Sequence, residues 1–197
     1  MDRDAIAADL ERARVTFHQL LETAGPDDWD APTRGTRWTN EQLLFHMVFG
    51  YMVVQRLLPL VRVMCRLPDP VSVTYARVLN AATTPFHQIN YYGSCAAALV
   101  YNRRRMGAKL DRVIAALQRR LARETDDALR RGMHFPPGWD PFFAEYMRLE
   151  DVYRYPGRHF HFHAAQLRLT CRSFANQFDT FPNRRMSNPS APSLHHA

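Results

Sequence analysis

The sequence of 197 residues predicts an all-α protein, a four-helix bundle with a long connection between its second and third helices. Three observations support this fold class. Four segments carry apolar residues at the three- and four-residue spacing of helices that bury one face. No segment of useful length has the two-residue alternation of a strand. Stretches that contain proline and glycine separate the four segments, as is typical of loops between helices.

The first two helices have recognisable ends. The first is expected over residues 4–24 and ends at Gly25-Pro26. The second begins at a capping box, in which the oxygen of Thr39 and the side chain of Gln42 satisfy free backbone N–H groups. Pro59 is expected to kink or end this second helix. The apolar faces consist of Ile6, Leu10, Ala13, Phe17 and Leu20 in the first helix and Leu43, Met47, Gly50, Val54 and Leu57 in the second.

The second helix is apolar enough to raise the question of a membrane span. Its interior contains Arg56 and Arg62. Two arginines at membrane depth cost about 5 kcal/mol or more on insertion scales. We therefore predict that this segment is a core helix and that the protein has no membrane partner.

The second half of the chain is less regular. Residues 67–92 contain several prolines and form the long connection, with a short helical piece over 73–81. Connections of this length in compact domains are often functional lids. The third helix is expected over 94–129. A turn-rich loop then leads to a fourth helix over 149–178, which Pro156-Gly157 disturbs.

The chain is expected to contain one domain. Apolar residues make up 46% of the sequence, which is enough for a single core. The bundle should span residues 1–178. The remaining residues, 179–197, are polar and rich in proline, so they are expected to form a disordered tail.

The formal net charge is +7, and much of the positive charge lies within residues 103–131. Such a stretch can bind nucleic acid, but acidic and apolar residues interrupt it, as on a solvated helix face. Aromatic residues do not alternate with the basic ones, so a base-stacking surface is not indicated. We expect no nucleic-acid partner.

The cysteines and the first residues bear on localisation. Cys65, Cys95 and Cys171 are odd in number and widely spaced, which argues against a disulfide framework and favours a reducing cytoplasm. The first residues are charged and lack the apolar core of a signal peptide. The protein is therefore expected to be cytoplasmic.

Two histidines of the fourth helix have the spacing of a metal-binding pair. His159 and His163 are four residues apart, so they lie within about 40° of each other on one helix face. A helix offers two imidazoles to one metal ion in this way. His161 lies about 200° away from His159 and should point elsewhere. The spacing alone leaves open a plain surface pair.

His46 is the candidate third ligand. It lies three residues after Leu43 and four before Gly50, so it shares the buried face of the second helix. A buried imidazole needs a partner. That partner is either a metal ion or a hydrogen-bonding carbonyl or hydroxyl, and the spacing does not choose between them.

Two motifs together resemble a known family. The segment from Trp38 to His46 resembles the W…H opening of the second helix in the DinB/YfiT-like superfamily. The segment from His159 to Leu167 resembles its closing HxxxHxxQL motif. The resemblance covers about residues 4–176. It implies a four-helix bundle in which three histidines bind a divalent metal ion, zinc or nickel.

Carried over onto this sequence, the implied metal ligands are His46, His159 and His163. The family includes transferases and isomerases that use mycothiol, bacillithiol or glutathione, and its members often form homodimers. An ion with three protein ligands keeps open positions and can bind a thiol as thiolate. The resemblance thus implies attack of a thiol on a small electrophilic substrate. The arginine-rich composition and the family favour mycothiol. The alternative is a non-catalytic, metal-binding stress-response bundle.

Two further residues are candidate catalytic groups. Gln166 either hydrogen-bonds a ligand histidine or a metal-bound water, or is a polar neighbour on the same helix face. His87, in the long connection, either acts as an acid or base at the mouth of the pocket or is an exposed bystander.

Other residues have weaker claims. Tyr91, Tyr92 and Tyr101 either line the pocket or pack at its rim. Arg103 to Arg105 either hold a substrate carboxylate or form part of the surface. No role is assigned to His134 or to His195-His196.

Overall fold

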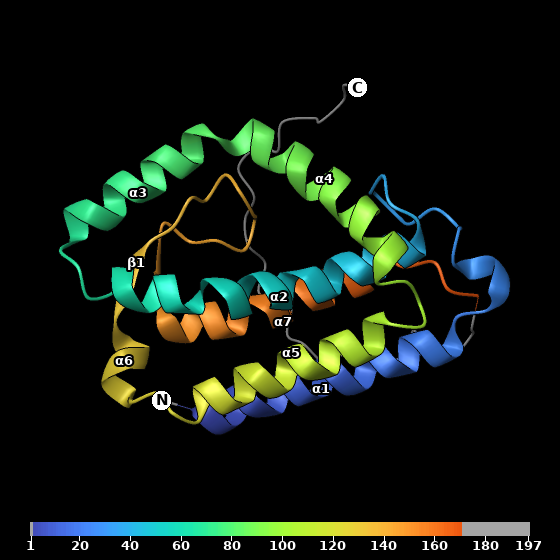
Figure 1. The fold of residues 1–197 in the computed structure, drawn as a ribbon, viewed down its shortest axis with the longest axis horizontal. Helices are drawn as coiled ribbons and strands as arrows, with labels where there is room; N and C mark the ends of the chain where they lie inside the picture. The colour runs from blue at the N-terminus through green and yellow to red at the C-terminus, as the bar shows by residue number, and fades with distance from the viewer. Residues whose placement is uncertain (1, 171–197) are drawn as a thin grey trace, which may run out of the picture.

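The computed structural model describes residues 2–170, and the chain is mostly helical over this range (Figure 1). The predicted tail lies outside the described residues. The elements are α1 Arg3–Thr23, the 3₁₀ turn η1 Pro26–Asp28, α2 Asn40–Met64, α3 Asp69–Ala81, α4 Thr83–Val100, α5 Met106–Leu121, α6 Asp126–Arg130, β1 Gly132–His134, β2 Tyr146–Arg148 and α7 Leu149–Ala164.

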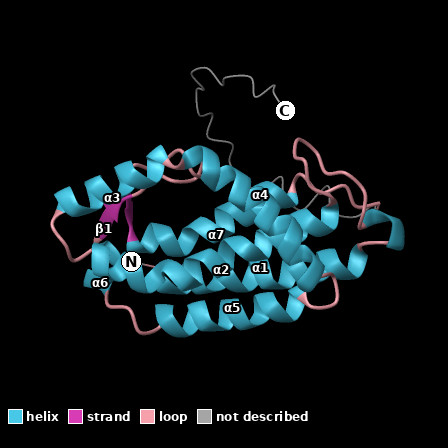
Figure 2. Ribbon diagram, turned by 45° about the horizontal axis from the view of Figure 1, so that its top comes forward, coloured by secondary structure: helices cyan, strands magenta, loops and turns pink. Residues whose placement is uncertain are grey.

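Helices α1, α2, α5 and α7 form the predicted four-helix bundle (Figures 1 and 2). Helix α2 packs against α5 and α7, and α1 packs against the same two helices from the other side. The apolar faces expected from the sequence point into this core, because each helix buries the stripe that its spacing defines. Leu57 is the exception: it is exposed, and its neighbour Leu58 is buried in its place. The largest buried side chains include Phe17, Phe45, Tyr51, Tyr153 and Phe160.

Helix α2 begins as predicted and continues past its proline. The backbone N–H of Thr39 donates to Oε1 of Gln42 at 3.1 Å, and the N–H of Gln42 donates to Oγ1 of Thr39 at 3.4 Å. Pro59 neither ends nor breaks the helix. A proline frees the carbonyl four residues earlier. In this structure the freed carbonyl of Gln55 accepts a hydrogen bond from the guanidinium of Arg120, at 2.5 Å.

Among the described helices, α2 alone is long and apolar enough to cross a membrane, and 56% of its apolar stretch is buried inside the protein. The central helix of a bundle has these same properties. The arrangement therefore agrees with the prediction of a core helix.

The long connection is almost entirely helical: α3 contains the helical piece predicted over 73–81, and most of the rest of residues 67–92, predicted as irregular, is helical as well. It consists of α3 and the first half of α4, which together form an arch over α2 (Figure 1). Pro85 stands in the first turn of α4, where a backbone N–H has no helical partner and its loss costs little. Pro70 and Pro85 thus lie in the first turns of helices, where the chain changes direction, and they do not prevent helix formation.

The predicted third helix, 94–129, is divided into the end of α4, α5 and α6. Asn102 forms the first break: its carbonyl accepts from Arg105 and Met106, and its side chain accepts from Arg104. Asparagine side chains compete with helical hydrogen bonds in this way. At the second break, Thr125 caps α6 through a hydrogen bond from Ala128, at 3.1 Å.

The fourth helix is shorter than predicted, because α7 ends at Ala164. The described residues that follow are not helical. Both the amide nitrogen and the amide oxygen of Asn40 bond the backbone of Arg168, at 2.8 and 3.0 Å. The carboxylate of Asp28 accepts from the backbone and hydroxyl of Thr170. These tertiary hydrogen bonds replace the helical ones. Residues 171–178 lie outside the described range.

Two other features of the second half differ from expectation. Pro156-Gly157 does not disturb α7, which is regular across this step. Gly157 instead allows α1 to approach, since a Cβ there would run into the carboxylate of Asp9. The antiparallel strands β1 and β2 pair Met133 with Met147. Each strand has only three residues, too few for a recognisable alternation.

Candidate metal centre

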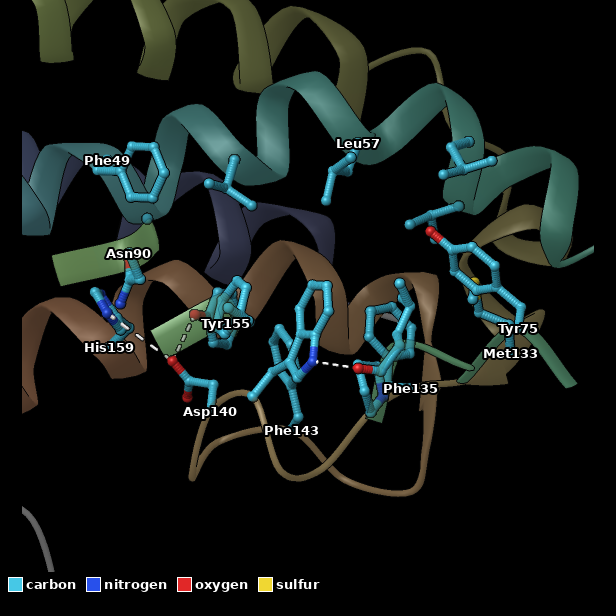
Figure 3. Close-up of a pocket in the computed structure, with 18 of the residues that line it drawn as sticks. Phe49, Leu57, Tyr75, Asn90, Met133, Phe135, Asp140, Phe143, Tyr155 and His159 are labelled. Atoms are coloured by element: carbon cyan, nitrogen blue, oxygen red, sulfur yellow. Dashed lines mark hydrogen bonds and ion pairs between the residues drawn. The ribbon is translucent and has the colours of Figure 1, made fainter. Parts of the chain in front are cut away.

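A cavity of about 150 Å³ lies between α2, the α3–α4 arch, the segment that joins β1 to β2, and α7 (Figure 3). One end of the cavity is bordered by His46 and His159, and the walls beyond them are mainly apolar. Concave apolar sites with a few converging polar groups are the usual form of ligand pockets. The end of the cavity at His46 and His159 is therefore the candidate functional site.

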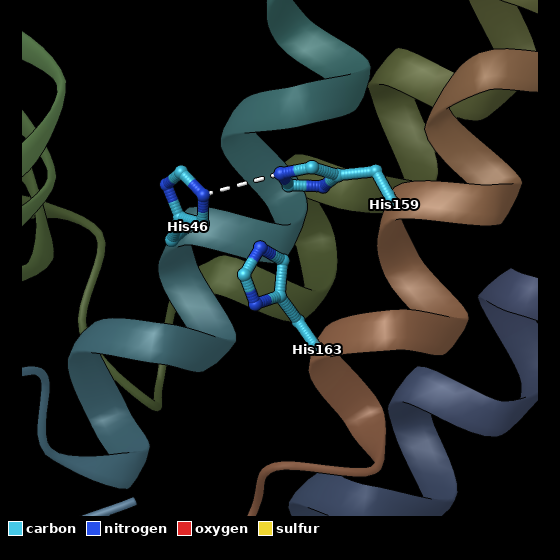
Figure 4. A group of neighbouring side chains, drawn as sticks. All are labelled: His46, His159 and His163. Carbon is cyan, nitrogen blue, oxygen red and sulfur yellow. Dashed lines mark hydrogen bonds between the residues drawn. The ribbon is translucent and has the colours of Figure 1, made fainter. Parts of the chain in front are cut away.

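Three histidines converge there, His46 from α2 and His159 and His163 from α7 (Figure 4). The Nε2 atoms of His46 and His159 are 3.1 Å apart. One ring nitrogen from each of the three residues lies within 4.8 Å of the other two. All three side chains are buried. The structure thus brings together the three residues that the resemblance implied.

Two of the rings are oriented by neighbouring side chains. Nδ1 of His46 lies 3.1 Å from the hydroxyl of Ser94, which is buried on α4. Nδ1 of His163 lies 2.7 Å from the amide oxygen of Gln166. A partner on one ring nitrogen sets the direction of the other, as is common for metal-ligating histidines. Gln166 therefore occupies the hydrogen-bonding position that the sequence left open.

The third ring, that of His159, is placed by a glycine. A Cβ on Gly50 would come within 2.9 Å of Nδ1 of His159, which is closer than real Cβ atoms approach. This Nδ1 is buried and has no hydrogen-bond partner among the described residues. The absence of a side chain at Gly50 is what gives the ring room between α2 and α7.

The three imidazoles are neutral at physiological pH. Burial, with a smaller effect from the ring of His163, lowers the pKa of His46 to about 3. Burial also lowers the pKa of His159 and that of His163. A metal ion requires imidazoles in this neutral form.

These residues fit a divalent metal ion. Two imidazole nitrogens bound to one tetrahedral zinc ion are about 3.3 Å apart, close to the separation observed between His46 and His159. A divalent ion between the facing Nε2 atoms of His46 and His159 would accept a lone pair from each neutral ring. An all-imidazole set suits zinc, nickel, copper and iron, and it leaves positions open for other ligands.

Asp140 is a site residue that the sequence analysis missed. Its Oδ2 lies 4.0 Å from Nε2 of His159 and accepts a hydrogen bond from the hydroxyl of Tyr155 at 2.8 Å. The backbone N–H of Phe142 holds its other oxygen, also at 2.8 Å. Burial raises the pKa of Asp140, and these hydrogen bonds oppose that rise. Asp140 lies in a turn-rich loop, and nothing in the sequence of that loop predicts that it folds back onto α7.

The aromatic linker before α2 covers another side of the histidines. The ring of Trp38 stacks on His46 with a centroid distance of 4.3 Å and lies edge-on to His163 at 6.2 Å. Trp38, the tryptophan that opens the first family motif, is thus packed on His46, the histidine that closes the same motif. His161 is near Asp9 and Arg12 of α1, away from the cluster, as its position on the helix predicted.

The other candidate residues do not border the cavity. His87 is exposed on α4, so it lies on a helix and not in a loop. Tyr91 stacks on Trp38, whereas Tyr92 is exposed. Tyr101 stacks on Phe45. Arg103, Arg104 and Arg105 are exposed beyond the end of α4, and the first of them lies over the ring of Trp29.

Comparisons with known proteins agree with this architecture. The fold resembles that of YfiT from Bacillus subtilis, described as a probable metal-dependent hydrolase with an unusual four-helix bundle topology. The TM-score is 0.57 with 18% sequence identity, over 84% of this chain and 83% of that one. No curated protein matches the sequence significantly. The model of the DinB superfamily matches residues 9–167. The chain belongs to the DinB superfamily.

Proposed function

We propose that this protein is a divalent-metal-dependent enzyme in which a low-molecular-weight thiol attacks a small electrophilic substrate, as a transferase or an isomerase. The observation that carries the proposal is the convergence of three buried imidazoles at one end of an internal cavity. Zinc or nickel is the expected metal ion and mycothiol the expected thiol. A divalent ion in this site lowers the pKa of a thiol or water molecule that it binds.

The residues around the histidines support a role in chemistry. Ser94 and Gln166 hold the rings of His46 and His163 in place. Asp140, 4.0 Å from His159, is positioned to accept the proton that the nucleophile loses and to return it to the leaving group. The walls of the cavity beyond the histidines are mainly apolar, so they lower the polarity of the surroundings in which the substrate would lie.

Hydrolysis is the second candidate function, and Asp140 is the observation that favours it. A carboxylate beside a metal site serves equally well as a base for a water molecule. The description of YfiT as a probable metal-dependent hydrolase points the same way. In this case the substrate is an ester or amide, and no thiol is consumed.

The test compares nucleophiles on one protein preparation. Zinc- or nickel-loaded protein is mixed with mycothiol, bacillithiol or glutathione and a model electrophile, and loss of free thiol is followed. The same preparation is given a chromogenic ester without thiol. Metal-dependent thiol consumption that His163→Ala abolishes supports the transferase. Ester hydrolysis without thiol consumption supports the hydrolase and overturns the thiol proposal.

A non-catalytic metal-binding bundle is the remaining alternative. The bundle has its own apolar core apart from the histidines. If the ion is catalytic, chelation should remove activity while the helical circular dichroism remains. Loss of helical structure on chelation, with no activity in any assay, would favour a structural metal ion.

We also propose that the protein is cytoplasmic and that it forms a homodimer. The two cysteines that the structure describes, Cys65 and Cys95, are free, which suits a reducing cytoplasm. A homodimer is expected from the family. Exposed apolar side chains such as Val15 on α1 and Leu99 on α4 are where its interface should be sought.

A further inference from the structure

The cavity continues well beyond the histidines, along one face of α2. Phe49, Val53, Leu57 and Leu60 line it at steps of four, four and three residues, the spacing of one helix face. Tyr75 and Met133 border the far end (Figure 3). The cavity is therefore elongated, with the candidate metal centre at one end only.

The wall opposite α2 is held in place by polar contacts behind the cavity. The indole N–H of Trp139 donates to the carbonyl of Leu79 at 2.7 Å, and its ring stacks on Phe86 with a centroid distance of 4.0 Å. The backbone N–H of Gly138 donates to Oδ1 of Asn80 at 3.0 Å. These contacts join the α3–α4 arch to the segment between β1 and β2. The cavity is thus preformed.

Apart from the hydroxyl of Tyr75 and the indole of Trp139, the polar lining groups gather at the histidine end of the cavity. His46, His159, Asn90 and Asp140 are there. The other lining side chains are mainly aliphatic or aromatic. Leu57, on the wall, is 43% exposed, so apolar surface in this cavity is open to water. An apolar occupant would cover that surface, and its own transfer from water would be favourable.

The dimensions define the occupant. From Phe49 to Val61 the wall follows α2 for about 18 Å, at 1.5 Å per residue. The volume of about 150 Å³ equals that of a cavity known to bind benzene. We infer that this cavity binds a linear alkyl or acyl chain of about six or more carbons. The chain belongs to the substrate, whose electrophilic carbon lies at the histidine end, a placement that rests on the proposed function.

Binding of linear alcohols tests the inference without a reaction. Full-length, zinc-loaded protein is titrated with 1-alkanols from butanol to dodecanol, followed by calorimetry and by tryptophan fluorescence. The dissociation constant should fall about fourfold for each added methylene and level off once the chain fills the cavity. An affinity that does not depend on chain length, or that levels off before hexanol, overturns the inference.

Variants of α2 locate the binding. Leu57→Trp and Leu60→Trp place a bulky ring in the cavity from partly exposed positions, so the core is left intact. Each should weaken octanol binding at least tenfold. Val63→Trp is the matched control, because this residue is exposed on the same helix and does not line the cavity. If folded Leu57→Trp and Leu60→Trp proteins both bind octanol as the control does, the cavity is not the binding site.

A separate measurement keeps this inference apart from the proposed function. Rates with four- and eight-carbon acyl substrates are compared on the same loaded protein. Chain-dependent alcohol binding without any turnover contradicts the proposed function and leaves the cavity assignment intact. Turnover that does not prefer the longer chain contradicts the assignment of the chain to the substrate.

Discussion

The amide oxygen of Gln166 lies 2.7 Å from Nδ1 of His163, three residues apart at the end of α7. The oxygen accepts the Nδ1 proton, which leaves the lone pair of Nε2 directed at the other two histidines. The hydroxyl of Ser94 contacts Nδ1 of His46 in the same way and so orients that ring. The site therefore includes the partners that orient its rings as well as the rings themselves.

Replacement of Gln166 by alanine should weaken metal binding by about 10- to 100-fold, the usual effect of losing a partner of a ligating histidine. The fold should remain, because Gln166 is only partly buried. Competition with a chromogenic chelator measures the affinity. Gln19→Ala, at an exposed position of α1, is the control and should bind metal as the wild type does. Equal affinities of the two variants would show that the hydrogen bond does not support the site.

Replacement of Gly50 by alanine should displace the ring of His159 and lower metal affinity. A new Cβ 2.9 Å from Nδ1 forces α2 and α7 apart or rotates the ring. Elsewhere in a helix the same change is favourable by about 1 kcal/mol. Gly93→Ala supplies this comparison, since a Cβ there meets nothing within 4 Å. Metal titration and thermal unfolding should thus separate the two variants, and similar behaviour would contradict the steric argument.

Replacement of His163 by alanine should remove the metal ion. The wild type is expected to contain one equivalent after loading, and the variant should lose at least about 100-fold in affinity, more than loss of an outer partner costs. Elemental analysis of dialysed protein measures this. His161→Ala, on the same helix but away from the cluster, should retain the metal. Absence of metal from all three proteins would refute the metal centre.

Replacement of Asp28 by asparagine should destabilise the protein in a pH-dependent way. Burial raises the pKa of Asp28, but hydrogen bonds from Gly25 and Thr170 outweigh it, so the net pKa is lowered. The charged form is therefore stabilised by folding. Its contribution is present above pH 4 and is lost as the pH falls through the folded pKa.

Urea unfolding at several pH values measures this contribution. The difference between wild type and Asp28→Asn should be largest near pH 7 and shrink below pH 4. Asp27→Asn is the matched control at an exposed neighbouring position. If the difference in unfolding free energy between the two proteins does not change with pH, the charge of Asp28 does not contribute to its hydrogen bonds with Thr170.

Much of the bundle was predictable because its signals are local. The capping box at Thr39 and the apolar stripes of α1 and α2 each depend on residues a few positions apart. The breaks were less predictable. The end of α7 depends on Asn40, which bonds Arg168 from a distant part of the sequence. Pro59 is tolerated because Arg120 of another helix bonds the carbonyl that it frees.

Spacing along the chain was enough to place His159 and His163 on one helix face and His161 elsewhere, because helical geometry sets the angle between residues four and two positions apart. It also placed His46 on a buried face. What His46 faces could not be predicted from that spacing, since it depends on how α2 packs against α7 and α4. The same packing brought Ser94 and Asp140 to the site and opened an apolar cavity beside it. Contacts between distant segments depend on how all the surfaces fit together, and spacing along the chain does not encode them.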